Sequence, residues 1–432
     1  MTTVWRNWGR TESVTPVERV RPTSADEVAS IIRSARDRRL RVKAVGTGHS
    51  FTGIAVAPGI QLDMSGLTGV VAANGTEVTL GAGTVLHDFP PLLDPLGLAL
   101  QNMGDVDVQT ITGATSTGTH GTGANFGGLA TRVTGATIAT ADGSLLTVNR
   151  STNADLLPAV ALGLGALGVL VDVTVDCVPS FKLHSVEQRE PLRAVLDDWQ
   201  RRIGDVDHFE FYYFPHTEVA LTKTNHRVGL DAPGRSLGRV QRWWEDDALP
   251  NRYYAASCGF QRMMPGSTPA INRMSVQVTG VREFTDLSYR VFSVPRRVHF
   301  REMEYALPVA EIPEVLDEIR ALIARKNWTI SFPIEVRVAA PDDLWLSTAT
   351  GRATGYIAVH RYHREDPTEY FAAVEEIFKA HQGRPHWGKM NTRTADDLAP
   401  TYPHFADFVA VRDRLDPERM FGNDYLDRVL GA

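Results

Sequence analysis

His49 stands inside a glycine-rich turn, VGTGHSFTGIA, that covers residues 45–55. Gly46 and Gly48 allow successive backbone N–H groups to curl around an anion, and Ser50 adds a hydroxyl donor. These features suit a ligand the size of a pyrophosphate. An ordinary turn between a strand and a helix, capped by the serine, fits the same letters equally well. The turn by itself therefore leaves the role of His49 open.

A second glycine-rich stretch, ITGATSTGTHGTGANFGG, covers residues 111–128. It is rich in threonine hydroxyls, almost free of charge, and placed between apolar β-like runs. A flexible linker has a similar composition, but a linker rarely carries a histidine such as His120. We interpret the stretch as an ordered loop around a large polar ligand, with His120 either orienting the loop or facing the ligand. Together the two stretches predict one extended ligand, such as a dinucleotide.

Residues 163–168, GLGALG, match the dinucleotide fingerprint G-x-G-x-x-G letter for letter. That fingerprint requires a strand before it and a helix after it, so that the pyrophosphate meets the N-terminus of the helix. In this chain a helix-like segment, 155–168, comes first and a β-rich run follows. The inverted order argues against an NAD-dependent dehydrogenase. It favours a tight turn from a helix into a strand, whose backbone could still touch a ligand.

Charged side chains in the C-terminal half fall at strand spacing. In FPIEVRV, Glu335 and Arg337 are two residues apart, so both point to one face of a predicted strand. A surface ion pair explains this pattern as well as a buried site does. His360 lies in another predicted strand, YIAVHRY, and Lys389 follows a glycine in HWGK. A lone lysine usually faces solvent, so the spacing alone assigns Lys389 no role.

The elements that must position these residues differ between the two halves of the chain. Ser24 precedes an acidic turn and apolar residues at helical spacing, which is typical of a helix N-terminus. Short β-like runs continue to Pro179, with a hairpin turn predicted at residues 141–144. Beyond Pro179 aromatic residues become dense, and helices are predicted over 312–326 and 368–381.

We predict an α+β protein with two domains. The chain has 432 residues, which is too long for one ordinary core. The change in composition near Pro179 places the first domain at residues 1–179 and the second at 180–415. The last stretch, 416–432, is expected to return to the first domain.

Composition narrows the possible partners. The net charge is −6 and no long basic run occurs, so nucleic acid is not an expected partner. Cys177 and Cys258 belong to no CxxC pair or His/Cys cluster, so we predict two free thiols and no metal site. The N-terminus lacks the apolar region of a signal peptide, and no apolar run is long enough to span a bilayer. We expect a cytoplasmic protein without an integral membrane segment, and contact with a membrane surface is left open.

Several motifs occur together in the order typical of flavoproteins of the vanillyl-alcohol oxidase type. They are NWGR, VKAVGTGHSFTGIA, ITGATSTGTHGTG, LGALGVL, EMEYALP, PIEVR, RPHWGK and FGNDYL, and they span nearly the whole chain. Within that superfamily the chain resembles the sugar-lactone and alditol oxidoreductases, most of all the gulonolactone dehydrogenases and oxidases. The resemblance implies an FAD-binding α+β domain of PCMH type. It also implies a substrate-binding domain with an antiparallel sheet flanked by helices.

The resemblance further implies that FAD is attached by one covalent bond, between His49 and the C8 methyl group of the flavin. A neutral imidazole nitrogen is a suitable nucleophile for this bond. Members that carry two bonds use an additional cysteine, which residues 111–128 lack. The remaining residues implied in cofactor binding are Val45, Gly46, Thr47, Gly48, Ser50, Phe51, Gly113, Ala114, Thr115, Thr117, Gly118, Thr119, His120, Gly121, Gly123 and Val169.

For catalysis the resemblance implies oxidation of an alcohol carbon by hydride transfer to flavin N5. Lys389 and Arg337 would stabilise the negative charge that grows on the N1–C2 edge of the flavin. Glu335 would hold a substrate hydroxyl, and His360 would accept or orient its proton. The expected substrate is L-gulono-1,4-lactone or a related aldonolactone, oxidised at C2 to a keto-lactone that tautomerises to ascorbate.

Two alternatives accompany this expectation. An alditol oxidase, which oxidises xylitol or sorbitol at C1 and produces hydrogen peroxide, shares the same motifs. A flavin-domain protein kept only for binding is disfavoured, because Glu335, Arg337 and Lys389 are all present. The expected electron acceptor is oxygen, or else a cytochrome or a quinone.

Overall fold

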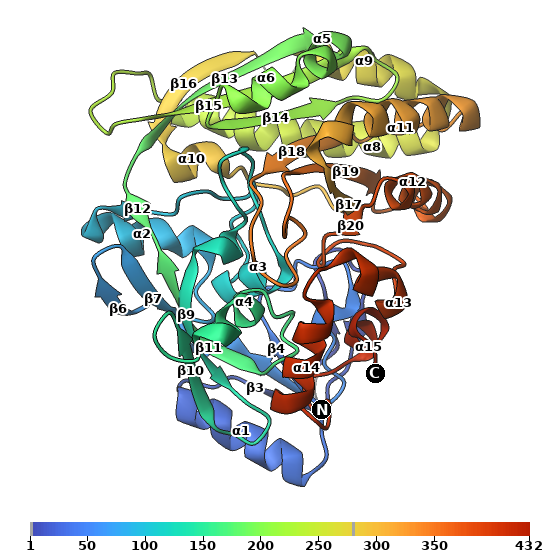
Figure 1. Ribbon diagram of the computed structural model, residues 1–432. Coiled ribbons are helices and arrows are strands. Elements are labelled where there is room, and N and C mark those ends of the chain that lie inside the picture. Colours follow the sequence, from blue (N-terminus) through green and yellow to red (C-terminus); the bar gives the residue numbers. More distant parts are fainter. Residues whose placement is uncertain (1–2, 279–280) are drawn as a thin grey trace.

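The structure of the protein, a computed structural model, describes residues 3–278 and 281–432. Helices and strands mix along the chain, and Figure 1 shows them in two parts, one above the other. The lower part holds the N-terminal strands in blue and green, and the red C-terminal helices return to it. The upper part holds the middle of the chain. This arrangement confirms the predicted α+β fold class.

Two sheets form the lower part. A parallel sheet has the order β3 (Glu18–Val20), β5 (Ile60–Asp63) and β4 (Val42–Val45). An antiparallel sheet has the order β10 (Leu145–Asn149), β9 (Val133–Ala139), β11 (Val169–Asp176), β7 (Glu77–Gly81) and β6 (Val70–Asn74).

Helix α1 (Ala25–Asp37) begins at the predicted cap, because the side chain of Ser24 accepts a hydrogen bond from the backbone N–H of Glu27. Its apolar face, which includes Ile32, packs in one cluster with Val42 of β4 and Val169 of β11. The helix therefore supports the strand that leads into the turn at His49. The predicted hairpin at residues 141–144 is confirmed by the antiparallel pairing of β9 with β10.

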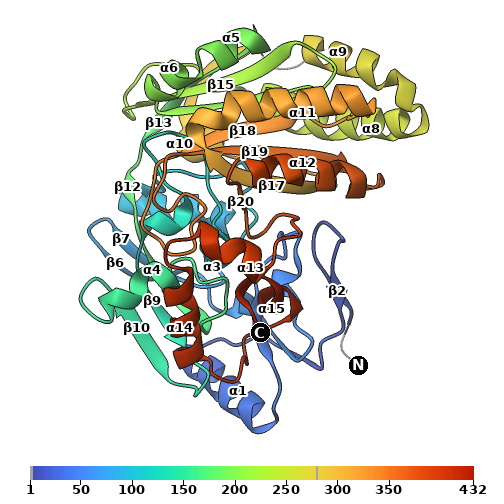
Figure 2. The same ribbon diagram turned by 45° about the vertical axis from the view of Figure 1, so that its right-hand side comes forward.

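The upper part is built on one eight-stranded antiparallel sheet, shown from a second direction in Figure 2. Its order is β16 (Arg282–Leu287), β13 (Lys182–Pro191), β15 (Val219–Val228), β14 (His208–Tyr213), β18 (Ile334–Ala339), β19 (Thr354–Tyr362), β17 (Phe300–Pro308) and β20 (Arg384–Pro385). Helices cover its outer face, namely α5 (Leu192–Asp197), α6 (Trp199–Gly204), α11 (Ile312–Lys326) and α12 (Thr368–Ala380).

Strand alternation decides which side chains of this sheet meet the lower part. Ile334, Val336 and Val338 pack in one buried cluster with α11 and α12. Glu335 and Arg337 therefore occupy the opposite, inner face, as their spacing predicts. Both side chains are buried, so the alternative of a surface ion pair is wrong.

The C-terminal chain returns to the lower part through three helices, α13 (Ala395–Leu398), α14 (Phe405–Leu415) and α15 (Asp424–Leu430). Leu398 of α13 and Phe408 of α14 lie in the same buried cluster as Val78 of β7. More of the chain thus lies against the lower part than the stretch 416–432 expected from the sequence.

The end of the chain also completes the parallel sheet. The backbone N–H of Val42 donates to the carbonyl of Met420 at 2.9 Å. The ammonium group of Lys43, which is buried, donates to the carbonyls of Gly165 (3.0 Å) and Phe421 (3.1 Å). Burial, and then the nearby charge of Arg412, lowers the pKa of Lys43 to about 7. Strand β4 is therefore held by segments from two distant parts of the sequence, at Gly165 and at residues 420–421.

Two predicted elements differ from the structure. Residues 111–128 begin as a helix, α3 (Ile111–Thr117), because the hydroxyl of Thr110 caps it by accepting the N–H of Gly113. The predicted helix over 155–168 is only one turn, α4 (Leu157–Val160). It stops because Leu164 and Gly165 both adopt a left-handed backbone, which an α-helix does not tolerate.

Both cysteines, Cys177 and Cys258, are buried free thiols. Among the described residues, none of the helices combines the length and the apolar character that a bilayer-spanning segment requires.

Candidate functional site

Two cavities meet where the upper and lower parts face each other. The larger has a volume of about 1410 Å³, counting its open mouth, and lies under the inner face of the upper sheet. The smaller, of about 780 Å³, runs into the lower part beside β4. The residues that line both are His49, Ser50, Gln109 and Thr117. The turn at His49 is thus the junction between the two cavities.

Most of the residues assigned to the cofactor line these cavities. The smaller cavity is lined by Val45, Gly46, Thr47, Gly48 and Gly113, and the larger by Phe51, Thr119 and His120. Six others line neither cavity, namely Ala114, Thr115, Gly118, Gly121, Gly123 and Val169. The GLGALG turn does reach the smaller cavity, through Leu164, Gly165 and Gly168. The backbone of this turn therefore lines the smaller cavity, although the order of its flanking elements is the reverse of that in the dinucleotide fingerprint.

The chemistry of the smaller cavity fits a dinucleotide. The backbone of Gly46 lies so close to the hydroxyl of Thr110 that a Cβ atom would come within 2.3 Å of it. Gly48 has a φ of +71°, which a side chain would disfavour. Glycine backbone and threonine hydroxyls are donors suited to phosphate oxygens. The larger cavity continues from His49 with room for a flat ring and a small substrate.

His49 is a neutral imidazole at the junction. Its ring stacks on that of Trp8, with centroids 5.5 Å apart and an interplanar angle of 20°. Burial, and then the positive charge of Lys389, lowers the pKa of His49 to about 4. Its Nδ1 is buried and has no hydrogen-bond partner among the described residues. A buried nitrogen without a partner is costly in a protein that holds nothing at this position, so it agrees with attachment of a ligand.

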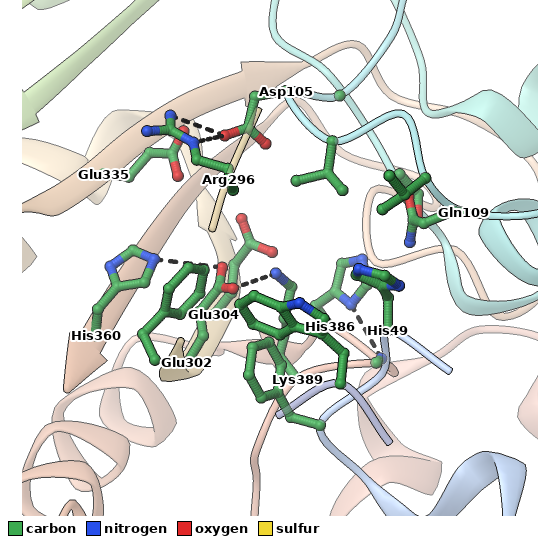
Figure 3. Close-up of a pocket in the computed structure, with 18 of the residues that line it drawn as sticks. His49, Asp105, Gln109, Arg296, Glu302, Glu304, Glu335, His360, His386 and Lys389 are labelled. Carbon is green, nitrogen blue, oxygen red and sulfur yellow. Dashed lines mark hydrogen bonds and ion pairs between the residues drawn. The ribbon is translucent and has the colours of Figure 1, made fainter. Parts of the chain in front are cut away.

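Lys389, Glu302 and His360 form one cluster beneath the inner face of the sheet (Figure 3), in which Glu302 and His360 are buried and the side chain of Lys389 is 24% exposed. The ammonium group of Lys389 forms an ion pair with Glu302. The other oxygen of Glu302 lies 3.6 Å from Nε2 of His360, which is its cross-strand neighbour. Nδ1 of His360 donates to the carbonyl of Pro333 at 3.1 Å, so Nε2 is the nitrogen that faces the cavity cluster.

The charges in this cluster support one another. Burial alone would raise the pKa of Glu302, but Lys389 and His360 outweigh it and hold that pKa below its usual range. Burial likewise disfavours the charged form of His360, yet the hydrogen bond and charge of Glu302 raise its pKa above the ordinary value. A proton that reaches Nε2 of His360 is therefore stabilised by Glu302.

A second cluster joins the glycine-rich stretch 111–128 to strand β17. Nε2 of His120 is 3.4 Å from Glu304, and Nδ1 of His120 donates to the carbonyl of Gly121 at 2.8 Å. The ring of His120 stacks on Tyr356, with centroids 3.6 Å apart. His386 accepts a hydrogen bond from the backbone of the Gly-Lys turn that carries Lys389, and burial lowers its pKa to about 4. His120 thus both orients its loop and lines the cavity.

Arg337 lies among three carboxylates. Its guanidinium forms an ion pair with Glu335, donates to Glu210 at 2.9 Å, and lies 3.5 Å from Asp105. Tyr212 donates to Glu335 at 2.9 Å. Burial raises the pKa of Glu335 to about 7, although Arg337 acts to lower it. Glu335 is therefore poised to change charge near neutral pH.

Arg296, which lies on a loop, belongs to the same charged group as Arg337. Its guanidinium lies 3.0 Å from Asp105. Burial would raise the pKa of Asp105, but Arg337 and Arg296 hold it below its usual range. Carboxylates and cations thus alternate along the cavity wall from Lys389 to Arg296 (Figure 3). Such a wall can bind several hydroxyl groups of one small polar molecule, each by a charge-assisted hydrogen bond.

All four predicted catalytic residues, Glu335, Arg337, His360 and Lys389, line the larger cavity. The sequence interpretation missed Trp8, Asp105, Gln109, Tyr212, Arg296, Glu302, Glu304 and His386, which line it as well. Glu302 and Glu304 carried a usable signal, since they are two residues apart in EMEYALP, as Glu335 and Arg337 are in PIEVR, although no strand was predicted there.

Comparison with known proteins identifies relatives over the whole chain. Residues 16–149 match the FAD binding domain family and residues 173–429 match the D-arabinono-1,4-lactone oxidase family. An L-gulono-1,4-lactone dehydrogenase of Mycobacterium tuberculosis is 43% identical, with 100% of each chain covered. The L-gulonolactone oxidase of Bos taurus is 34% identical, with 98% of each covered. An alditol oxidase of a Streptomyces species is 31% identical, with 100% of each covered.

The fold has relatives among solved structures. A solvent-stable cholesterol oxidase superposes with a TM-score of 0.83 at 18% identity, over 100% of this chain and 98% of the other. This likeness concerns the two-part fold, in which an FAD-binding domain faces a second domain of sheet and helices. The family matches, the relatives and the joined cavities agree with one another. The chain therefore belongs to the D-arabinono-1,4-lactone oxidase family of FAD-dependent oxidoreductases, which act on CH–OH groups.

Proposed function

We propose that this protein oxidises L-gulono-1,4-lactone, or a closely related aldonolactone, at the C2 hydroxyl. One observation carries the proposal: the charged group of Glu302, His360, Lys389, Glu335 and Arg337 lines the larger cavity, which His49 also lines. A compact polyol-like molecule offers enough hydroxyls to pair with this group. The relatives over the full chain, which include L-gulono-1,4-lactone dehydrogenase at 43% identity, support the lactone rather than a free alditol.

FAD, when bound, accepts the hydride that leaves the alcohol carbon. Lys389 and Arg337 supply the fixed positive charge near the place where negative charge develops, and a preorganised charge acts there without further rearrangement. Glu335, in its ionised form, accepts a hydrogen bond from a substrate hydroxyl. We assign the smaller cavity to the nucleotide part of the cofactor and the junction at His49 to the ring.

His360 takes the hydroxyl proton in this proposal. Its Nδ1 is committed to the carbonyl of Pro333, so Nε2 is the atom that receives the proton. The carboxylate of Glu302 lies 3.6 Å from Nε2 and stabilises the imidazolium that forms. Lys389 forms an ion pair with the same carboxylate. Glu302 therefore links His360, which accepts the proton, to Lys389, the cation that favours hydride transfer.

We also propose which part of the chain binds the cofactor and which part binds the substrate. A further proposal concerns the electron acceptor. Residues 1–179 bind the cofactor, and the chain from residue 180 to the start of α13 binds the substrate. The predicted return at 416–432 is extended to α13 and α14, which pack in the lower part and complete the cofactor domain with α15. The acceptor that reoxidises the cofactor is oxygen, or a cytochrome or quinone. Family matches at residues 16–149 and 173–429 support the two-domain division.

Anaerobic reduction of the purified protein tests the substrate. We expect L-gulono-1,4-lactone to bleach the flavin absorbance on the time scale of a stopped-flow experiment. Xylitol at the same concentration should bleach it far more slowly. Faster bleaching by xylitol would reassign the protein to the alditol oxidases. Bleaching by neither, in a protein that is reduced by dithionite, would reject both substrates.

Precipitation in acid tests the covalent bond to His49. We expect the yellow colour and the mass of one FAD to stay with the wild-type polypeptide, because a neutral, unpartnered imidazole nitrogen at the cavity junction is placed to form the bond. His49→Ala should release all flavin into the supernatant. His87→Ala, a change at an exposed histidine, should behave as the wild type does. Free FAD from the wild-type protein would reject the bond.

A further inference from the structure

A hairpin near the start of the chain lies against the turn that carries His49. Its two strands, β1 (Trp5–Arg6) and β2 (Ser13–Val14), pair antiparallel, and the motif NWGR, residues 7–10, lies in the tip between them. Figure 2 shows the hairpin in blue, extending from the lower part toward the upper part. It precedes residue 16, where the match to the FAD binding domain family begins, so the hairpin is an addition to the part of the chain that matches that domain.

Two hydrogen bonds join the tip of the hairpin to the backbone on both sides of His49. The backbone N–H of Trp8 donates to the carbonyl of Gly48 at 2.8 Å. The side-chain amide of Asn7, which is buried, donates to the carbonyl of Ser50 at 2.9 Å. The residue before His49 and the residue after it are therefore both held by the hairpin.

Close packing accompanies these hydrogen bonds. The hydroxyl of Thr11 donates to the carbonyl of Phe51 at 2.7 Å. Gly9 lies so close to the ring of Phe51 that a Cβ atom on this glycine would come within 2.7 Å of it. On the other side of His49, a Cβ atom on Gly48 would lie 3.1 Å from the indole of Trp5. The hairpin thus contacts the turn from its second glycine to Phe51.

The indole of Trp8 contacts the imidazole ring of His49 itself. The two rings are stacked, with centroids 5.5 Å apart. The same indole also meets two rings of the upper part, those of His299 (centroids 4.6 Å apart) and Phe300 (5.3 Å). Ring pairs at separations of about 4.5–7 Å attract each other beyond the effect of burial. Trp8 therefore holds the ring of His49 by its face and is itself supported by the upper part.

Contact through the face of the ring leaves its nitrogen atoms free to react. The bond-forming lone pair of an imidazole nitrogen lies in the plane of the ring, where a stacked indole does not block it. Nδ1 of His49 is buried and has no hydrogen-bond partner among the described residues, so no hydrogen bond of its own orients it. The orientation of the ring therefore depends on the stacking and on the backbone contacts of the hairpin. Holding a reacting group in one geometry lowers the barrier to bond formation.

We propose that Trp8 and Asn7 position His49 for its attachment to the flavin, a role that rests on the covalent bond proposed above. The bond joins an imidazole nitrogen to the C8 methyl carbon. In forming it, the imidazole loses its N–H proton, and the methyl group loses one proton and two electrons. The flavin takes up both protons and both electrons, and the electron acceptor proposed above removes them again. Trp8 and Asn7 exchange no proton or electron in this step and act only by holding the ring.

The rate of flavin attachment tests the proposal. Full-length protein from riboflavin-starved cells is mixed with saturating FAD, and the flavin that stays with the polypeptide in acid is measured over time. We expect Trp8→Ala to slow attachment by about tenfold or more, because a small misplacement of a reacting group is costly. Trp8→Phe should recover most of the rate, since a phenyl ring also stacks. Asn7→Ala should slow attachment as well, because it removes the hydrogen bond to Ser50.

Trp345→Ala is the matched control, because Trp345 stacks on His404 with centroids 5.8 Å apart and lines neither cavity. It should attach FAD at the wild-type rate. If the wild type holds acid-stable flavin and Trp8→Ala attaches FAD equally fast, the positioning role is overturned and the bond to His49 stands. The same conclusion follows if Trp8→Ala binds less FAD but attaches all that it binds at the wild-type rate. Flavin that the wild type releases in acid would reject the bond and the positioning role together.

Discussion

Lys389→Met is expected to slow reduction of the flavin by its substrate by about 10²-fold or more, the usual cost of losing a preorganised charge at a developing anion. The change keeps an unbranched side chain but removes the ammonium group, and with it the cation–π contact in which Nζ lies 5.5 Å from the centroid of the Phe51 ring. It also leaves Glu302 without its cation, so the pKa of that buried carboxyl rises. Both proton removal and hydride transfer are then expected to slow, because Glu302 also stabilises the protonated form of His360.

Stopped-flow reduction under anaerobic conditions measures this effect directly. Lys379→Met is the matched control, since it makes the same change in an ion pair with the exposed Glu376 on α12. Its reduction rate should stay within about twofold of the wild type, as expected for a surface pair. A near-normal rate for Lys389→Met in a protein that holds its full complement of FAD would remove Lys389 from the mechanism.

Arg337→Met is expected to slow flavin reduction to a similar extent and also to destabilise the fold. Three carboxylates depend on this guanidinium, those of the buried Glu335 and Glu210 and of the partly buried Asp105. Breaking such a buried pair costs about 3–5 kcal/mol of the free energy of unfolding, because a charge is left uncompensated. Arg337→Lys should recover part of the stability but little of the rate, since an ammonium group cannot reach all three partners.

The pH dependence of stability separates this electrostatic role from a simple loss of packing. In the wild type the pKa of Glu335 is about 7, above the ordinary carboxyl value. The folded state therefore holds this proton more tightly than the unfolded state, and stability falls as the pH rises toward 7. Without Arg337 the pKa of Glu335 rises further, so the fall should extend to higher pH.

Thermal unfolding across a pH series measures this shift. Arg201→Met is the control, because Arg201 pairs with Asp205 on the exposed surface of α6. Its pH profile should match that of the wild type. An Arg337→Met profile parallel to the wild type would mean that Glu335 does not respond to this guanidinium.

The sequence predicted the catalytic strands well because strand alternation is local. Glu335 and Arg337 were placed on one face from spacing alone, and the structure puts both on the inner face of the sheet, where His360 of the neighbouring strand also lines the cavity. The same rule applies to Glu302 and Glu304, whose positions follow directly once β17 is recognised as the neighbour of β19. Without that pairing, two glutamates on a strand do not reveal what they face.

Other parts of the site depend on long-range contacts that no local pattern encodes. Asp105 and Arg296 lie on loops, and they meet only because the two parts of the fold face each other. The helix α3 inside the glycine-rich stretch was missed, because its start depends on one hydroxyl, that of Thr110, just before the stretch begins. The GLGALG turn lines the smaller cavity although it lacks the strand-then-helix order of the fingerprint.

The contacts around Lys43 have a consequence for biosynthesis. Strand β4 leads into the turn at His49, yet one of the two carbonyls that accept hydrogen bonds from the buried ammonium group of Lys43 belongs to Phe421. Asn423 similarly seals the segment after that turn, with its amide donating to the carbonyls of Gly53, Ile54 and Val56. During synthesis these partners are absent until residues 421 and 423 have left the ribosome. We therefore expect the segment around His49 to be assembled only then, so that a shorter growing chain has an incomplete flavin pocket.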